Sequence, residues 1–192
     1  MGKVYECIDE RIQAWITEQE MFFIATAPLS GDGSVNLSPK GLDTLRVLDE
    51  HTLVFLDTGG SGIETIAHVR ENGRIVVMMC AFQDPPMTYR FHGRGQVILP
   101  GGEGFDTLAA LFERSEFGIR AIIRIKVTRV SDSCGYGVPL YDFRGQRDLL
   151  AEDLQSTGRD KFVAQFTDLW ATSIDGLPGL TPEESATFTG PR

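Results

Sequence analysis

Apolar residues recur along the chain first at helical and then at strand spacing. An amphipathic helix from Ile8 to Glu20 is predicted by the apolar positions Ile8, Ile12, Trp15 and Ile16. The period then changes, because the runs Met21–Pro28 and Val35–Lys40 are rich in β-formers and flank the turn-forming stretch "LSGDGS". These two runs predict a first β-hairpin.

Four further strands and two short helices follow from the same patterns. The strands are expected at His51–Asp57, Arg74–Phe82, Thr88–Leu99 and Arg120–Val130, and the helices at Ile63–Asn72 and Phe105–Arg114. Six or so strands with few intervening helices do not fit a doubly wound parallel sheet. Short links between them favour an antiparallel sheet closed into a barrel, in a mainly β protein with flanking helices (α+β).

Length and charge narrow the class of protein. The 192 residues suit a single domain spanning 1–192, with a core at about 21–140 and a C-terminal helical extension at about 141–192. A net charge of −9 argues against nucleic-acid binding and against binding to anionic membranes. The N-terminal stretch carries charges throughout, so neither a signal peptide nor a membrane anchor is expected.

The cysteines and histidines give little sign of chemistry. Three scattered cysteines without C-x-x-C spacing favour a reducing cytoplasm, and nothing in the sequence pairs Cys134 with a base. The loop "SDSCGYGVPL" around Cys134 is either a binding loop or a simple turn. His51, His68 and His92 show no ligand spacing, so no metal site is expected.

The glycine-rich stretch "DTGGSGIET" (Asp57 to Thr65) leads into a predicted helix. Such a turn presents backbone N–H groups and the positive end of the helix dipole to an anion, for example a phosphate. Alternatively, Ser61 and Glu64 have the spacing of a capping box, in which the serine caps the helix. The sequence alone does not distinguish the anion site from the capping box.

The stretch "NLSPKG" is a second candidate site. Alternation places Asn36, Ser38 and Lys40 on one strand face, while Pro39 lacks an N–H and marks a strand end or edge. Lysine and serine together can bind an anion, and Gly41 lets a flat ligand approach the backbone. On these residues alone, a solvated edge with a lysine that discourages edge pairing is the favoured alternative.

Four segments in order, "NLSPKG", "GSGIETIAHVRENGRI", "YRFHGRG" and "RVSDSCGYGVPL", resemble the pyridoxamine 5′-phosphate oxidase family. The similarity runs from about Met21 to Leu140, with a weaker echo in "SIDGLPGL". It implies a six-stranded antiparallel split β-barrel that forms a homodimer. It also implies FMN as the cofactor, bound in grooves at the subunit interface, and a small-molecule substrate.

The resemblance also implies site residues. Lys40 falls near the basic residue that opens the family's FMN-binding strand, and Ser61 matches the serine of its Ser-Arg-Lys phosphate signature. The Arg-Lys pair itself is missing, so we expect either that Lys40, Arg94 or Arg124 replaces it or that FMN binds weakly. The expected cofactor-binding residues are Ser38, Lys40, Gly41, Leu56, Asp57, Thr58, Ser61, Gly62, Thr65, Arg94 and Arg124.

Three functions are compatible with these features. The first is an FMN-dependent oxidoreductase acting on an unknown small molecule, with no catalytic side chain assigned. The second is a homodimer that binds a flavin or haem without turnover, and the third is a structural dimer with an empty groove. The C-terminal region lacks the Arg-x-His motif of the vitamin B6 oxidases, so that particular activity is not expected.

Overall fold

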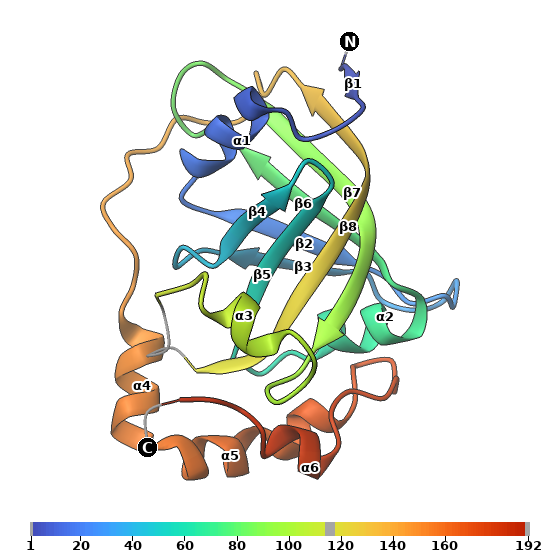
Figure 1. Ribbon diagram of the computed structural model, residues 1–192, viewed down its shortest axis with the longest axis vertical. Helices are drawn as coiled ribbons and strands as arrows, with labels where there is room; N and C mark the ends of the chain where they lie inside the picture. Colours follow the sequence, from blue (N-terminus) through green and yellow to red (C-terminus); the bar gives the residue numbers. More distant parts are fainter. Residues whose placement is uncertain (1, 114–117, 191–192) are drawn as a thin grey trace.

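The computed structural model describes residues 2–113 and 118–190 (Figure 1). Its strands are β1 (Val4–Tyr5), β2 (Phe22–Thr26), β3 (Asn36–Lys40), β4 (Leu45–Asp49), β5 (Thr52–Thr58), β6 (Arg74–Cys80), β7 (Thr88–Ile98) and β8 (Ile119–Ser133). Its helices are α1 (Glu10–Thr17), α2 (Glu64–Asn72), α3 (Phe105–Ala109), α4 (Leu149–Thr157), α5 (Arg159–Ala171) and α6 (Pro182–Ser185). No helix in the described ranges is long and apolar enough to cross a membrane.

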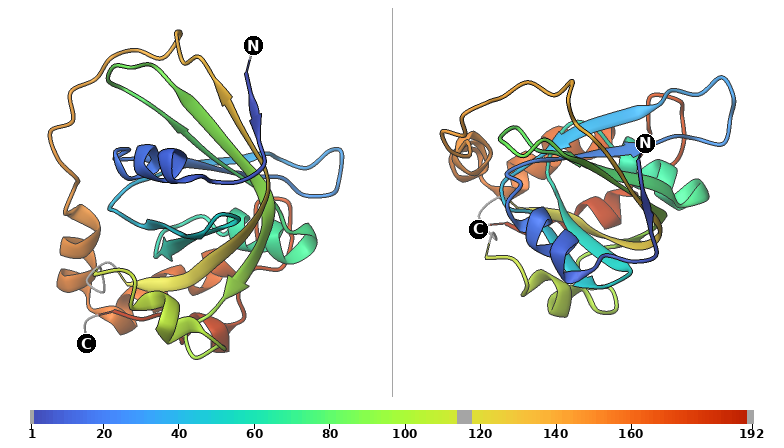
Figure 2. Two further views of the ribbon diagram at one scale, coloured as in Figure 1. Left: turned by 45° about the horizontal axis from the view of Figure 1, so that its top comes forward. Right: turned by 90° about the horizontal axis from the view of Figure 1, so that it is seen from above.

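All strands belong to one curled antiparallel sheet with the order β3-β2-β6-β7-β8-β5-β4, and β1 pairs with the end of β8. The two end strands, β3 and β4, follow each other in the chain without pairing in the described structure, so the barrel is split between them (Figures 1 and 2). The predicted antiparallel barrel with flanking helices is confirmed. The sheet has eight strands rather than the six predicted. The two additional strands, β1 and β4, were not predicted because β1 has only two residues and the mixed stretch "LRVLD" of β4 has little strand signal.

The first hairpin forms as expected, with Phe22 opposite Lys40 and Phe23 opposite Pro39. Alternation is visible in β3, where Asn36, Ser38 and Lys40 are partly buried while the residues between them are exposed. Because β3 is an edge strand, it is a place in the sheet where a residue without an N–H, such as Pro39, is tolerated.

Local capping sets the helix ends. Asp9 caps α1 by accepting a hydrogen bond from the Ile12 N–H, and α2 ends at Gly73, whose φ of 72° is left-handed. The predicted helix from Phe105 is shorter than expected, since α3 ends at Ala109, and Arg114 lies outside the described residues.

Two apolar clusters stabilise the sheet, one on each of its faces. Inside the barrel, Phe55 is fully buried and meets Phe22 edge-on, with 5.9 Å between ring centroids. On the outer face, Val54 and Leu56 of the same strand pack under α3. The alternating side chains of β5 therefore serve two cores.

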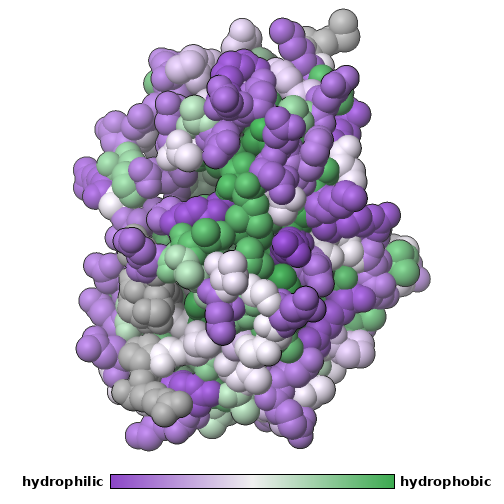
Figure 3. Space-filling model, in the orientation of Figure 1, coloured by the Kyte–Doolittle hydropathy of each residue, from purple (hydrophilic) through white to green (hydrophobic). Residues whose placement is uncertain are grey.

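The C-terminal helices close one end of the barrel, beside α2 (Figure 1). An extended segment from residue 134 to residue 148 leads to them along the outside of the barrel (Figure 2). Trp170, Phe162 and Phe188 are fully buried and continuous with the barrel core. Elsewhere polar side chains cover most of the face in Figure 3, and hydrophobic ones gather in a band over β4 and β5.

We predict that Phe55→Ala lowers the free energy of unfolding by about 3–5 kcal/mol, because it removes a fully buried ring and leaves a cavity. Urea denaturation monitored by circular dichroism measures this loss. Leu37→Ala is the control, since Leu37 is 63% exposed on the outside of β3 and its truncation should change stability by less than about 0.5 kcal/mol.

Candidate functional site

A β-bulge at the end of β5 places an arginine in the protein interior. Asp57 pairs with Ala121 and Thr58 pairs with Ile119, so Arg120 is the extra residue on β8. Bulges re-aim side chains and are common beside active sites. Here the bulge directs Arg120 toward the carboxylate of Asp57.

Asp57, Arg120 and Lys40 form a buried ionic group, which we call the Asp57 cluster. The Nε and Nη2 atoms of Arg120 each lie 2.8 Å from Asp57 Oδ2, and the Lys40 ammonium lies 3.6 Å from Oδ1. Asp57 is 0% exposed, and its Oδ1 has no hydrogen-bond partner among the described residues. Two cations thus face one carboxylate, which leaves an excess of one positive charge.

The glycine-rich turn lies against this cluster. Arg120 Nη1 donates a hydrogen bond of 3.1 Å to the Gly60 carbonyl, and the indole N–H of Trp170 donates one of 2.7 Å to the same oxygen. The guanidinium also lies over the Trp170 ring, 5.2 Å from its centroid. At Gly59 an added Cβ would lie 2.6 Å from the Phe162 ring, so only glycine fits under the C-terminal helices.

Within the described part of the chain, no side chain caps the helix that follows the turn. Ile63 is the N-cap of α2, and it makes no side-chain capping hydrogen bond. Glu64 instead accepts a hydrogen bond of 3.3 Å from the Ile174 N–H. The capping-box interpretation of Ser61 and Glu64 is therefore wrong, because a contact from the distant C-terminal segment occupies the glutamate.

Polar side chains continue from the cluster along the inner face of β3. Asn36 donates hydrogen bonds of 3.0 Å to the hydroxyls of both Thr26 and Thr65, and it accepts one of 3.1 Å from Ser38. His68 Nδ1 shares a 3.0 Å hydrogen bond with Thr26, while its buried Nε2 has no partner among the described residues. This network fixes the orientation of the β3 face that Lys40 shares.

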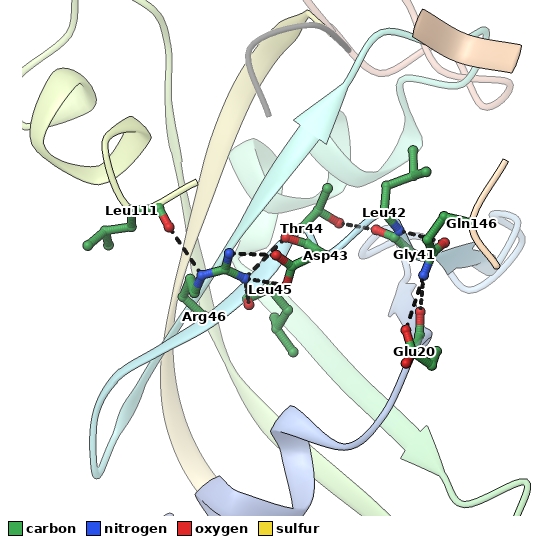
Figure 4. Close-up of polar contacts among 9 residues, drawn as sticks. All are labelled: Glu20, Gly41, Leu42, Asp43, Thr44, Leu45, Arg46, Leu111 and Gln146. Atoms are coloured by element: carbon green, nitrogen blue, oxygen red, sulfur yellow. Dashed lines mark hydrogen bonds and ion pairs between the residues drawn. The ribbon is translucent and has the colours of Figure 1, made fainter. Parts of the chain in front are cut away.

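A tight turn joins β3 to β4 across the split of the barrel (Figure 4). Leu42 and Asp43 have φ angles of 61° and 52°, which is unusual for residues with a side chain. The Arg46 guanidinium holds Asp43 through hydrogen bonds of 2.7 and 2.8 Å, and the Thr44 hydroxyl donates to the Gly41 carbonyl. The surrounding contacts compensate for the strained backbone.

The segment leading to the C-terminal helices also binds this turn. Gln146 accepts a hydrogen bond from the Leu42 N–H and donates one to the Glu20 carbonyl, each 3.0 Å long (Figure 4). A cavity of about 270 Å³ adjoins the turn, between the end of α1 and β4. It opens beside Gly41, the residue that follows Lys40.

A larger cavity of about 800 Å³ lies elsewhere, between the start of α5 and residues 187–190. It contains none of the predicted site residues. Its arginine, Arg159, already donates to the Phe188 carbonyl and pairs with Asp160. We therefore place the candidate site at the Asp57 cluster rather than in the larger cavity.

Comparison with known sequences assigns the chain to a family. A family profile described as pyridoxamine 5′-phosphate oxidase matches residues 8–134. The pyridoxamine 5′-phosphate oxidase family protein ustO of Aspergillus flavus is 34% identical over 194 residues, which cover 92% of this chain and 77% of ustO. The chain belongs to the pyridoxamine 5′-phosphate oxidase family.

Solved structures support the same fold. A variant of HupZ from Group A Streptococcus superposes with a TM-score of 0.52 at 21% identity, covering 66% of this chain and 99% of HupZ. A candidate pyridoxamine 5′-phosphate oxidase from Lactobacillus delbrueckii gives a TM-score of 0.50 at 15% identity, covering 66% and 94% of the two chains. The family match ends at residue 134, so the helices that contact the glycine-rich turn lie beyond it.

The structure brings part of the predicted site together. The residues at or beside the cluster and its turn are Ser38, Lys40, Gly41, Asp57, Thr58, Ser61, Gly62 and Thr65. Leu56 points to the opposite face of the sheet, under α3. The two arginines also lie elsewhere: Arg94 is exposed and donates to the Asn72 carbonyl, and Arg124 is exposed on β8, paired in register with Val54 and Gln96.

Sequence reasoning missed Arg120 and Trp170. Simple alternation places Arg120 on the same strand face as the exposed Arg124, and only the bulge reverses this. Trp170 follows Gly60 by 110 residues in the sequence, so no local pattern connects them. The burial of Asp57, which requires a basic partner nearby, is visible only in the structure.

We predict that Arg120→Met lowers the free energy of unfolding by about 3–5 kcal/mol, because it removes both 2.8 Å contacts to Asp57 Oδ2 and leaves the buried carboxylate with only the partly exposed Lys40 ammonium, 3.6 Å from Oδ1. The double variant Asp57→Asn/Arg120→Met should lose less free energy of unfolding than Arg120→Met alone, since no buried charge is then left at position 57. Urea denaturation measures both. The exposed Arg124→Met on the same strand is the control and should change stability by less than about 0.5 kcal/mol.

A second prediction concerns pH and the attachment of α6 to α2. The hydrogen bonds that Arg70 donates to Glu184, one of them 2.8 Å long, lower the pKa of Glu184 below its ordinary 4.5. The stabilisation is therefore present above pH 4.5 and is lost as pH falls through the lower folded pKa. The melting temperature of Glu184→Gln should lie below that of the unaltered chain at pH 7, and this gap should narrow below pH 4.5.

Glu103→Gln is the control for this experiment, because it removes the same charge from an exposed loop. A gap of constant size down to pH 3 would contradict the role of the Glu184 carboxylate.

Proposed function

We propose that this family member is an FMN-binding oxidoreductase that acts on a small molecule as a homodimer. The observation that carries the proposal is the excess of positive charge in the Asp57 cluster, directly behind a glycine-rich turn and a helix start without a side-chain cap. Backbone N–H groups at a helix start and a nearby cation together favour a phosphate.

The residues present fit the phosphate of FMN. The Lys40 side chain is partly exposed, with 23% of its surface open to solvent, so its ammonium can turn from Asp57 to a ligand. Arg120 stays buried and keeps Asp57 neutralised when Lys40 does so. Space for the ligand exists at the turn, because a Cβ added to Gly60 would meet nothing within 4 Å. The turn, α2 and Lys40 would hold the phosphate end.

FMN, when bound, supplies the hydride or electron transfer, and the protein binds and orients it. In this chain the polar face of β3, fixed by the Asn36 network, and the cavity beside Gly41 offer room along the barrel split for the rest of the cofactor or its substrate. We do not propose oxidation of vitamin B6 phosphates, because the C-terminal region carries no Arg-x-His motif.

The homodimer is proposed from the family and from one exposed segment. Between residues 134 and 148 the chain exposes large apolar side chains, among them Tyr136 (82%), Leu140 (68%) and Tyr141 (62%). Aromatic and apolar anchors of this kind are typical of protein interfaces. A cytoplasmic location is proposed because Cys7, Cys80 and Cys134 are all free thiols.

We predict that the purified chain binds FMN and that Lys40→Ala raises the dissociation constant about 10- to 100-fold, as expected for the loss of a hydrogen bond to a charged group. Quenching of FMN fluorescence measures the affinity. Arg124→Ala is the matched control, because Arg124 is exposed on the outside of β8, and its affinity should equal that of the unaltered chain.

Three outcomes would change the proposal. No quenching of added FMN would overturn flavin binding, and an equal loss in Arg124→Ala would overturn the site. Bound FMN that a reductant does not bleach would support the non-catalytic alternative.

A further inference from the structure

We propose that Trp170 and Arg120 are positioning residues for the phosphate site: by holding the Gly60 carbonyl, they direct the Ser61 N–H toward the ligand. This inference rests on the proposed function, and it assigns a role to the C-terminal helices that lies beyond the family match at residues 8–134.

The first step is the double hydrogen bond to one carbonyl. The indole N–H of Trp170 and the Nη1 of Arg120 both donate to Gly60 O, at 2.7 and 3.1 Å. A glycine peptide has unusual conformational freedom, so without these donors the turn would sample several orientations. Two donors from different elements, α5 and β8, restrict it to one.

The second step is the geometry of the peptide bond. Among the described residues only Asp84–Pro85 is cis, so the peptide that joins Gly60 to Ser61 is trans. In a planar trans peptide the C=O and N–H bonds point in opposite directions. With the Gly60 carbonyl turned inward to Trp170 and Arg120, the N–H of Ser61 is turned outward, on the side where Ser61 is exposed.

The third step is the rigidity of Trp170. Its ring is fully buried and stacks on Phe166, with 5.8 Å between centroids, and it lies 5.5 Å from the ring of Phe188. The same C-terminal region is attached to α2 by the pair Arg70–Glu184 and by the Arg70 hydrogen bond to the Gly179 carbonyl. The indole therefore has a fixed position relative to the helix whose start would bind the phosphate.

The role of these residues differs from general stabilisation in one measurable respect. An oriented Ser61 N–H contributes only to a ligand that carries a phosphate. Riboflavin has the same ring as FMN but no phosphate, so its affinity should not depend on the Gly60 carbonyl. The ratio of the two dissociation constants isolates the positioning effect.

The test is Trp170→Phe, which keeps an aromatic ring in the cluster and removes only the indole donor. We expect the dissociation constant for FMN to rise about three- to tenfold, the size expected for one hydrogen bond, while that for riboflavin stays within about twofold. Trp15→Phe is the matched control, because Trp15 packs on Tyr89 far from the turn, and it should change neither constant.

A second measurement uses the unaltered chain and does not depend on the folding of a variant. In ¹⁵N-labelled protein the Ser61 amide resonance should shift on addition of FMN or of inorganic phosphate, and not on addition of riboflavin.

The outcomes separate this inference from the proposed function. If the unaltered chain binds FMN but Trp170→Phe keeps the same FMN-to-riboflavin ratio, or the Ser61 amide does not respond to FMN, the positioning role is overturned and the proposed function stands. If the unaltered chain binds neither FMN nor riboflavin, both the positioning role and the proposed function are overturned.

Discussion

A carboxylate that is wholly buried must be paired with a cation. In this protein the pairing of Asp57 determines how the strands, the glycine-rich turn and the C-terminal helices are arranged at one end of the barrel. Arg120 reaches Asp57 only because a bulge interrupts the regular pairing of β5 with β8. Its guanidinium, once turned inward, needs further acceptors and a cover, which the Gly60 carbonyl and the Trp170 ring provide. Strand end, glycine-rich turn and C-terminal helices are therefore one coupled unit, although they come from three distant parts of the sequence.

The same cluster bears on the anion site that we propose for this acidic protein. A net charge of −9 produces a field that repels phosphates at long range. Solvent ions screen that field over about 8–10 Å, whereas a partly buried excess charge acts at contact distance and is screened much less. In the proposed site, two cations around one carboxylate, next to the start of α2, would supply the short-range attraction that the overall composition lacks.

The features that the sequence predicted correctly are those that depend on neighbouring residues alone. The hairpin of β2 and β3, the shared face of Asn36, Ser38 and Lys40, and the edge position of Pro39 follow from alternation and from a missing N–H. That this polar face is the partly buried one, rather than a solvated edge, depends on the tertiary structure. The short strand β4, the bulge at Arg120 and the capture of Glu64 by the Ile174 N–H depend on tertiary partners. If alternation is continued through the bulge, it places Arg120 on the outer face of the sheet, which is wrong. Ser61 and Glu64 have the spacing of a capping box but do not form one, because Glu64 accepts a hydrogen bond from the distant Ile174 N–H.

The missing Arg-Lys pair has a physical consequence for how the site is stabilised. Charges on the helix after the turn would depend on the local conformation of that helix, and they would be solvated. Lys40 and Arg120 instead project from β3 and β8, behind the turn, and Asp57 holds them in place. Their positions depend on the register of the whole sheet and on the cover that Trp170 provides. In the proposed site, binding strength would be linked to global stability, because loosening either the sheet end or the C-terminal helices would release the cations and the Gly60 carbonyl together.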